Sequence, residues 1–377
     1  MKKPTAIGPR LARGHTTLQL VRFLDPNHCV PANRKHSSPQ ERAFPLIAIR
    51  YWHQRRKRKN AMAIPQRASV VITTRSRKDD LRTALQSAVR QTARPEIIVI
   101  DDGSTDETAK MVQSEFPQVR LIHHDDSRGL IVRRNEGARL AVGEVVFSID
   151  DDAAFTSAYT VEQTLREFDD PCIGAVAIPY VEPNKGELVF QQAPAGSDVW
   201  ITDSFVGTSH AVRRDIFLQL GGYRELLIHQ GEERDFCARM LSSGRLVRLG
   251  RADVIHHYES PKRDMRRMDY YGRRNDVLFV WHIVPMPYFP VHMVGTTFNG
   301  VRSAWRARRA ANMLGGVLSG YADCLSQWNA RSPVPVAVYR LHRKLKKSGP
   351  FSIEDIRGQL PPLMQLPDIL STKISFP

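Results

Sequence analysis

Short apolar runs alternate with helical patterns between residues 69 and 149, and this alternation limits the possible folds more than any other feature of the chain. The apolar runs are rich in β-branched residues and cover 69–73, 97–100, 119–122 and 144–149. The segments between them show patterns typical of helices, over 79–92, 106–115 and 130–142. Strands that alternate with helices form a mainly parallel sheet with helices on both faces. The chain is therefore predicted to have an α/β fold.

Aspartates stand at the ends of two of these runs. Asp101 and Asp102 follow the second run, and the triplet 150–152 follows the fourth. Ligands of parallel sheets bind at this carboxyl edge of the strands. Adjacent carboxylates repel one another and lose solvation when partly buried, a cost that a divalent cation with oxygen ligands, Mg²⁺ or Mn²⁺, removes. The triplet predicts a metal–diphosphate site, with a solvated acidic loop as the alternative.

The positive charge of the chain is concentrated at its N-terminus. Of the formal net charge of +16 over 377 residues, +13 belongs to residues 1–67, which hold 15 Lys/Arg and two acidic residues. The nearly neutral remainder argues against a nucleic-acid-binding body. The basic run 55–59 suits RNA or anionic lipid, but a solvated, disordered extension over 1–66 is the favoured interpretation. Met62 lies just before the first strand, and we hypothesise that translation begins there.

Cysteine and apolar patterns indicate a reduced protein without a spanning helix. The four cysteines are widely separated, so neither a disulfide framework nor a zinc site is indicated. No run of 18 apolar residues occurs, and the most apolar region, 277–301, is interrupted by three prolines. That region predicts short helices that bury an apolar face, against a membrane surface in one interpretation. We expect a cytoplasmic location, with peripheral contact to the inner face of the membrane as a further hypothesis.

The pattern becomes less regular after residue 152. Further elements are predicted as strands near 173–180, 188–192 and 254–255 and a helix over 235–241, and residues 261–347 look mostly helical. The resulting division has three parts, a basic extension over 1–66, an α/β domain over 67–260 and a helical C-terminal region over 261–377.

Five segments of the chain, taken together, resemble family 2 inverting glycosyltransferases of the GT-A fold. In chain order they are VVITTR at 70–75, IDDGSTD at 100–106, GLIVRRNEG at 129–137, DDD at 150–152, and the pair GGYRE at 221–225 with GEERD at 231–235. The resemblance covers about residues 68–280. It implies a nucleotide-sugar donor, a divalent cation and a hydroxyl acceptor. The region 277–309, which mixes apolar helices with arginines, favours a lipid-linked or cell-envelope glycan as that acceptor.

The resemblance implies roles on the donor side. Asp102, with Asp101, would accept a hydrogen bond from the imide N–H of uracil or thymine, because a charge-assisted bond is stronger than a neutral one. Thr73 and Arg75 would line the same pocket, and Arg134 would contact the base or ribose. The family often carries an aromatic residue at the position of Arg75, which leaves the choice of base open. A turn with a helix cap is the structural alternative for Asp101 and Asp102.

The diphosphate and the cation would be held by the aspartate triplet. By the resemblance, Asp150 would meet the ribose or the metal shell and Asp152 would ligate the cation, which stabilises the leaving nucleoside diphosphate. His256 is the predicted histidine ligand or phosphate donor, with its neighbour His257 in the same doublet. The segment 273–275, an Arg-Arg-Asn sequence, resembles a phosphate-contacting pair, and a solvated helix face is its alternative.

An inverting transfer needs one base to deprotonate the acceptor hydroxyl. By the resemblance that base is Glu233, the second acid of the GEERD segment, where many members carry Asp. Glu232 and Asp235 are the other candidates, and all three carboxylates would also suit the N-terminus of the helix that follows. The predicted activity is therefore metal-dependent transfer, of the hexosyltransferase type, from a UDP- or dTDP-sugar.

Two other classes of protein remain as alternatives. A sugar-nucleotide nucleotidyltransferase shares a nucleotide-binding α/β half, but it would carry a glycine-rich phosphate loop after the first strand, where residues 73–77 contain no glycine. A dinucleotide-binding dehydrogenase lacks support for the same reason. A non-enzymatic RNA- or membrane-binding protein rests on the N-terminal extension alone.

Overall fold

The computed structural model describes residues 68–258, 264–307 and 309–364, which all belong to a compact unit spanning Ala63–Pro377. The basic extension and the Met62 hypothesis lie outside the described residues. The boundary predicted between residues 260 and 261 falls in a segment that is also outside them, so the three-part division stays a prediction.

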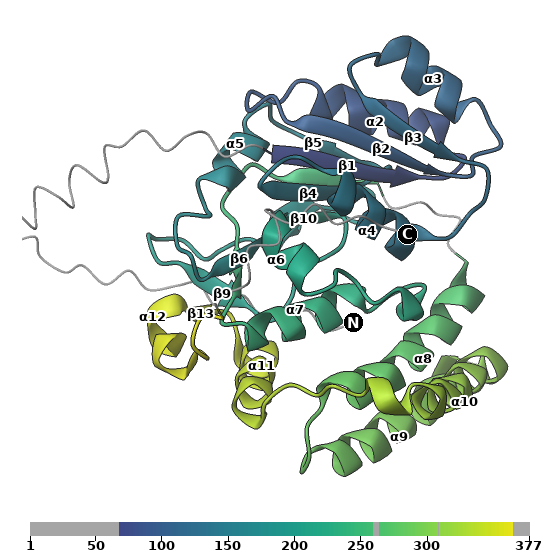
Figure 1. The fold of residues 1–377 in the computed structure, drawn as a ribbon, viewed down its shortest axis with the longest axis vertical. Coiled ribbons are helices and arrows are strands. Elements are labelled where there is room, and N and C mark those ends of the chain that lie inside the picture. The colour runs from purple at the N-terminus through teal and green to yellow at the C-terminus, as the bar shows by residue number, and fades with distance from the viewer. Residues whose placement is uncertain (1–67, 259–263, 308, 365–377) are drawn as a thin grey trace, which may run out of the picture. The chain divides into compact units, whose positions relative to one another are not determined.

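A nine-stranded sheet forms the centre of the described unit (Figure 1). Its strand order is β13 (Phe351–Ser352), β9 (Trp200–Thr202), β11 (Leu246–Leu249), β6 (Ile173–Ala177), β10 (Ser209–Arg213), β4 (Val145–Asp150), β1 (Ala68–Thr74), β2 (Glu96–Asp102) and β3 (Arg120–His124). The strands β4, β1, β2 and β3 are parallel, whereas β10 runs antiparallel to both β4 and β6. The predicted α/β fold with a mainly parallel half-sheet is confirmed.

Helices and a small second sheet surround the central one. The second sheet has the order β5 (Ala153–Phe155), β12 (Ile255–His257), β7 (Tyr180–Val181) and β8 (Val189–Phe190). The helices of the first half are α2 (Lys78–Ala88), α3 (Thr108–Glu115), α4 (Leu130–Leu140), α5 (Thr160–Leu165) and α6 (Arg214–Gln219). The predicted helices of this half are confirmed, within a few residues at their ends.

The C-terminal part is mostly helical, as predicted. It contains α8 (Met265–Ile283), α9 (Phe289–Ala307), α10 (Ala310–Ser326), α11 (Val336–Ser348) and α12 (Ile353–Ile356). Helices α8, α9 and α10 pack against one another (Figure 1), and α7 (Glu232–Ser242) contacts both α8 and α11. Among the described residues, none of the helices has the length and apolar content needed to cross a bilayer.

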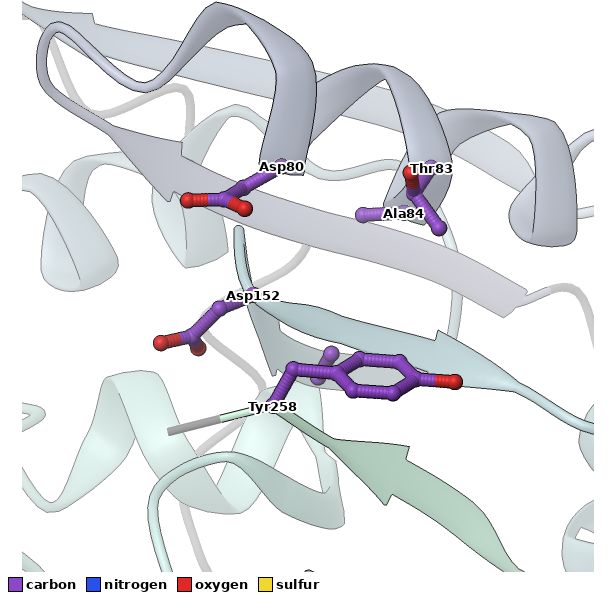
Figure 2. Close-up of a pocket in the computed structure, with 6 residues that line it drawn as sticks. Asp80, Thr83, Ala84, Asp152 and Tyr258 are labelled. Carbon is purple, nitrogen blue, oxygen red and sulfur yellow. The ribbon is translucent and has the colours of Figure 1, made fainter. Parts of the chain in front are cut away.

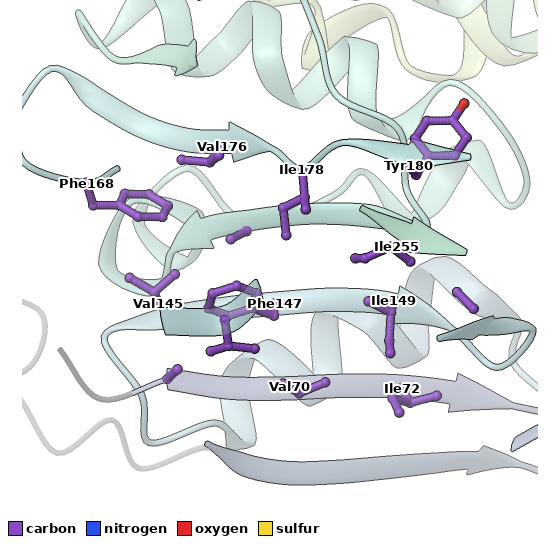
Figure 3. Packing of buried hydrophobic residues seen from close by; sticks show 14 of the residues in the cluster. Val70, Ile72, Val145, Phe147, Ile149, Phe168, Val176, Ile178, Tyr180 and Ile255 are labelled. Atoms are coloured by element: carbon purple, nitrogen blue, oxygen red, sulfur yellow. The ribbon is translucent and has the colours of Figure 1, made fainter. Parts of the chain in front are cut away.

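Two buried clusters cover the two faces of the sheet because strand side chains alternate. On β1, Val70 and Ile72 belong to one cluster and Val71 to the other. Figure 3 shows the first cluster, in which Phe147 of β4 lies among the apolar residues of neighbouring strands. Apolar contacts on both faces hold β1 and β4 in register, and this register decides which residues meet at the carboxyl edge.

Candidate active site

The aspartate triplet begins at the carboxyl end of β4, in the middle of the sheet. The register of β4 with β1 places Asp150 beside Thr73. The chain then turns and forms β5, which pairs antiparallel with β12 so that Ala153 lies opposite His257. A histidine more than 100 residues away in sequence is thereby brought to the side of Asp152.

Asp150, Asp152 and His257 form a cluster that can hold a metal ion, since one ligand atom from each lies within 4.8 Å of the others. The Nε2 atom of His257 is 3.4 Å from Oδ1 of Asp152, and its Nδ1 atom is 3.6 Å from Oε1 of Glu182. A carboxylate behind the second ring nitrogen is the usual way in which a metal-binding imidazole is oriented. The buried Oδ1 atom of Asp152 has no hydrogen-bond partner, so the residues fit a cation.

The histidine of this cluster is His257, whereas the sequence prediction named His256. Neighbouring residues of a strand point to opposite faces, and the ring of His256 instead lies 3.1 Å from the hydroxyl of Tyr258. His257 therefore takes the place of His256 as the candidate ligand. Oxygen ligands with one imidazole suit Mn²⁺ or Mg²⁺.

Arg77 holds the second half of the triplet, a contact that the sequence analysis did not anticipate. Its guanidinium donates to Oδ1 of Asp151 at 2.8 Å and to Oδ2 of Asp152 at 2.9 Å. Thr74 donates to the other oxygen of Asp151 at 2.8 Å. The only signal in the sequence was a cation three residues after the end of the first strand.

The two aspartates titrate differently. Burial is the main cause that raises the pKa of Asp151 to about 7. Burial acts in the same direction on Asp152, but its interactions with His257 and Arg77 outweigh burial and lower the pKa of Asp152. Asp152 is therefore the charged member that faces the cluster, and Asp151 is turned toward β1.

A cavity of about 320 Å³ opens beside Asp152. Figure 2 shows the carboxylates of Asp80 and Asp152 on one side of it and the ring of Tyr258 across it. Thr83 and Ala84 of α2 complete the wall.

The carboxylates at the end of β2 are engaged by the protein itself. Asp102 accepts hydrogen bonds from the hydroxyl of Ser127, the backbone N–H groups of residues 128 and 129, and Nε of Arg133, at 2.6–2.9 Å. These bonds outweigh burial and lower its pKa. Asp101 accepts from the backbone N–H of Ser104 at 2.9 Å and lies 2.8 Å from Nδ1 of His123. Both carboxylates therefore shape the loops of this edge. Because Asp102 already accepts four hydrogen bonds, a contact of Asp102 with a base would require one internal donor to move.

The two other residues predicted for the nucleotide pocket lie at the end of β1. Thr73 is buried, and its hydroxyl has no hydrogen-bond partner. Arg75 is exposed just beyond it. The structure thus brings Thr73 next to Asp150 and leaves the side chain of Arg75 at the surface.

Arg134 of α4 connects the triplet to the acidic pair of α7. Its Nη2 atom donates to Asp150 at 2.5 Å, and its Nη1 atom lies 3.4 Å from Glu232 and 3.8 Å from Glu233. The guanidinium is buried, and burial of a charge is tolerated where partners of opposite sign surround it. Residues from three distant segments therefore form one charged network.

Glu232 and Glu233 open α7, and burial raises the pKa of both. The charge of Glu232 adds to the shift of Glu233 and Arg134 opposes it. The side chain of Glu233 keeps 20% of its surface exposed, against 3% for Glu232. Asp235, the third candidate, accepts hydrogen bonds from Nε of Arg224 and Nε of Arg239 at 2.8–3.1 Å. The side chain of Asp235 is only 3% exposed, so the most accessible carboxylate of the three is that of Glu233.

The Arg-Asn pair that the resemblance linked to the phosphates, Arg274 and Asn275, is bound to the loop before α7. Arg274 donates to the backbone of Leu226 and to Asp323, at 2.8 and 2.6 Å. Asn275 donates to three carbonyls of residues 227–230, at 2.7–2.9 Å. Both side chains are buried, and they hold the loop that leads into α7.

Gly207 allows Glu233 and Arg134 to approach the backbone. A Cβ atom at this position would overlap Oε1 of Glu233 and would lie 2.6 Å from Nη1 of Arg134. We expect Gly207→Ala to fold but to lower the turnover number about 10- to 100-fold, since small misplacements of reacting groups are costly. Gly358→Ala is the control, because nothing lies within 4 Å of its Cβ. Unchanged kinetics of Gly207→Ala would show that these side chains adjust freely.

Comparisons with known proteins point to one kind of enzyme. Residues 69–221 match the family described as Glycosyl transferase family 2. An uncharacterized glycosyltransferase, YibD of Escherichia coli, is 39% identical over 107 residues, which are 27% of this chain and 31% of that protein. The glucosyl-dolichyl phosphate glucuronosyltransferase of Haloferax volcanii is 28% identical over 42% of this chain and 56% of its own. The matched parts thus span about a third to a half of these two relatives.

Solved structures share the fold at low sequence identity. Staphylococcus aureus TarS 1-349 in complex with UDP-GlcNAc has a TM-score of 0.51 and 16% identity, over 73% of this chain and 83% of that one. GalNAc-T7 with UDP, GalNAc and Mn²⁺ has a TM-score of 0.50 and 18% identity, over 72% and 59%. At this identity the likeness shows the GT-A fold. Residues 69–221 therefore form a domain of the glycosyl transferase family 2 type, and the chain has a GT-A fold.

Proposed function

We propose that this chain is a metal-dependent inverting glycosyltransferase that moves a hexosyl group from a UDP- or dTDP-sugar to a hydroxyl acceptor in cell-envelope or polysaccharide synthesis. The observation that carries the proposal is the buried network in which Arg134 joins Asp150, at the candidate metal end, to Glu232 and Glu233. The proposal draws support from this network because it requires a leaving-group site and a base close together, here on either side of the Arg134 guanidinium.

The reaction needs one proton transfer and one displacement. Glu233 takes the proton of the acceptor hydroxyl as the hydroxyl oxygen attacks the anomeric carbon, the bond from that carbon to the diphosphate oxygen breaks, and the nucleoside diphosphate leaves. Attack from the face opposite the leaving group inverts the anomeric centre. A cation held by Asp150, Asp152 and His257 would neutralise the charge that develops on the leaving diphosphate.

The raised pKa of Glu233 suits a base and leads to a prediction on pH. As a base, Glu233 must be deprotonated, so the rate rises with pH through its pKa. Glu232→Gln removes the negative charge that raises this pKa and leaves Arg134, which lowers it. We expect the acidic limb of the kcat/KM profile to move to lower pH by about one unit, the usual size of the effect of one close charge.

The control for this shift is Glu187→Gln, which removes the same charge from an exposed position. Profiles are measured at saturating Mn²⁺ with one nucleotide sugar. An acidic limb that stays in place, or that moves to higher pH, would show that Glu232 does not tune the base.

The first test of the activity is nucleotide release from the full chain. A panel of UDP-, dTDP- and GDP-sugars is supplied with Mn²⁺ or Mg²⁺, with and without EDTA, and donor binding is followed by calorimetry in the same samples. Metal-dependent binding and release with one uridine or thymidine nucleotide support the proposal. If no nucleotide sugar binds in the presence of metal, the proposed activity is wrong.

The acceptor and the location belong to the same proposal. We infer a glycan or lipid-linked acceptor and a cytoplasmic enzyme that contacts the inner face of the membrane. Support comes from the name of the Haloferax relative, a glucosyl-dolichyl phosphate glucuronosyltransferase, and from the exposed apolar residues of α9 described below.

A further inference from the structure

Helix α9 exposes a continuous row of large apolar side chains. The row, called here the α9 stripe, consists of Val291, Val294, Phe298, Val301 and Trp305, which are 48–85% exposed. Their spacing of three and four residues puts them on one face of the helix. The opposite face is packed, with Gly300 and Ala304 buried. An exposed apolar row of this length on a packed helix marks a binding surface.

The charge of the surrounding region indicates which surface the stripe meets. Residues 264–364 hold 15 Lys/Arg and six Asp/Glu, whereas residues 68–263 hold 24 and 30. On α9 itself, Arg302 and Arg306 are exposed beside the stripe. A basic amphipathic helix with an exposed Trp is suited to the interface of an anionic membrane, where lipid phosphates meet the basic side chains.

A cavity of about 430 Å³ lies on the inner side of α9, between this helix and α7, α8 and α11. Its charged lining is mainly basic and consists of Arg234, Arg343, Lys346 and Lys347 against one acid, Asp276. Asp276 is already shared by Arg234 and Arg273, each at 3.1 Å. The positive charges of the cavity therefore exceed what its own acid neutralises.

The rest of the lining combines apolar walls with an unused polar atom. Phe279, Val280, Val284 and Tyr339 supply apolar and aromatic surface. His342 is 2% exposed, and its Nε2 atom has no hydrogen-bond partner. A basic cavity with apolar walls and an unpartnered buried nitrogen matches a ligand with an anionic head and an apolar body.

The cavity and the candidate base lie on two sides of the same helical turn. Arg234 follows Glu233 directly, and consecutive residues of a helix project about 100° apart. The side chain of Arg234 points into the cavity and stacks on Phe279, at 4.1 Å from the ring centre. A head group bound there is close to the catalytic edge of α7.

We propose that this cavity binds the phosphate of a membrane lipid, with Arg234, Arg343 and Lys346 around the phosphate and the α9 stripe in the apolar layer. The basic cavity binds the head group on one face of α9. The stripe, on the opposite face of α9, inserts into the bilayer and keeps the helix there. If the bound lipid also carries the sugar acceptor, the inference rests on the proposed function. The binding itself requires neither donor nor transfer.

The test measures binding of the full chain to vesicles by co-sedimentation. Three compositions are compared: phosphatidylcholine alone, with 20% phosphatidic acid and with 20% phosphatidylserine. We expect binding to phosphatidic acid vesicles to be at least about tenfold tighter than to phosphatidylserine vesicles, because two or three basic side chains contact the exposed monophosphate. Arg343→Gln combined with Lys346→Gln is expected to abolish this ratio.

Matched controls separate the cavity and the stripe from general charge. Arg340→Gln combined with Lys344→Gln removes the same charge from α11 outside the cavity and is expected to keep the ratio. Phe298→Asp adds a charge to the stripe and is expected to weaken binding to all anionic vesicles at least about tenfold. Asn299→Asp adds the same charge at the neighbouring exposed position and is expected to have a smaller effect.

Several results would overturn the inference. One is an equal affinity for phosphatidic acid and phosphatidylserine vesicles, and another is an affinity ratio that stays unchanged in the variant with Arg343→Gln and Lys346→Gln. A third is full competition by millimolar inorganic phosphate, which would indicate a site for free anions. A dimer that Phe298→Asp dissociates, without any effect on vesicles, would assign the stripe to a second copy of the chain. Calorimetry with nucleotide sugars on the same samples reports separately on the proposed activity. A failure of the lipid-binding proposal therefore does not imply a failure of the proposed function, and the reverse also holds.

Discussion

Glu233→Gln is expected to lower sugar transfer about 10²- to 10⁴-fold, the usual contribution of a positioned base. The amide cannot take the proton of the acceptor hydroxyl, yet it has nearly the shape of the carboxylate and fits beside Gly207. Binding of the nucleotide sugar should stay within about twofold of the wild type, because the proposed mechanism assigns Glu233 to the acceptor and not to the donor. The measurements are single-turnover transfer and donor calorimetry.

The neighbouring acids are the controls for this result. Asp235→Asn should lower thermal stability, because it leaves Arg224 and Arg239 without their shared carboxylate. Glu232→Gln should retain transfer at high pH. If Glu233→Gln transfers sugar at the wild-type rate while Glu232→Gln does not, the base is Glu232.

Asp152→Asn is expected to weaken Mn²⁺ binding about 100-fold or more and to lower transfer in parallel. An amide donates only one neutral oxygen, and the loss of a direct ligand exceeds the 10- to 100-fold cost of losing a supporting contact. Mn²⁺ affinity is measured by calorimetry without donor, which gives a readout independent of activity. Removal of metal with EDTA should abolish transfer by the wild-type protein and be reversed by added Mn²⁺.

The two histidines of β12 form a matched pair for the same experiment. His257→Gln should weaken Mn²⁺ binding, since this ring lies against Asp152, whereas His256→Gln should leave it unchanged because its ring contacts Tyr258. Equal losses in both variants would mean that the histidines act through the stability of β12. A loss confined to His256→Gln would restore the original prediction.

Local patterns were enough to predict the α/β fold and the positions of the acidic segments. A parallel strand and the helix after it are encoded by continuous apolar runs and helical spacing, and the carboxyl edge follows from the parallel arrangement. Asp101, Asp102 and Asp150 were located at this edge for that reason. The choice of Glu232 and Glu233 as candidates came from their order in the family pattern and stays a prediction.

Several contacts at the site could not be derived from spacing. Arg77 reaches the aspartate triplet because β1 and β4 are neighbours in the sheet, although more than 70 residues separate them in sequence. Gly207 lies against Glu233 and Arg134 only because the loop between β9 and β10 packs against α4 and α7. The pairing of Asp235 with Arg224 and Arg239 was likewise not indicated by any sequence pattern.

The choice between His256 and His257 shows most directly where local information ends. The amino-acid sequence alone determined the type of fold, the acidic edge and the doublet of histidines, because these depend on the periodicity and chemistry of short segments. Only the tertiary structure decided which histidine faces Asp152, since that depends on the register of β12 against β5. A shift of one residue in that register would turn the other ring toward the metal cluster.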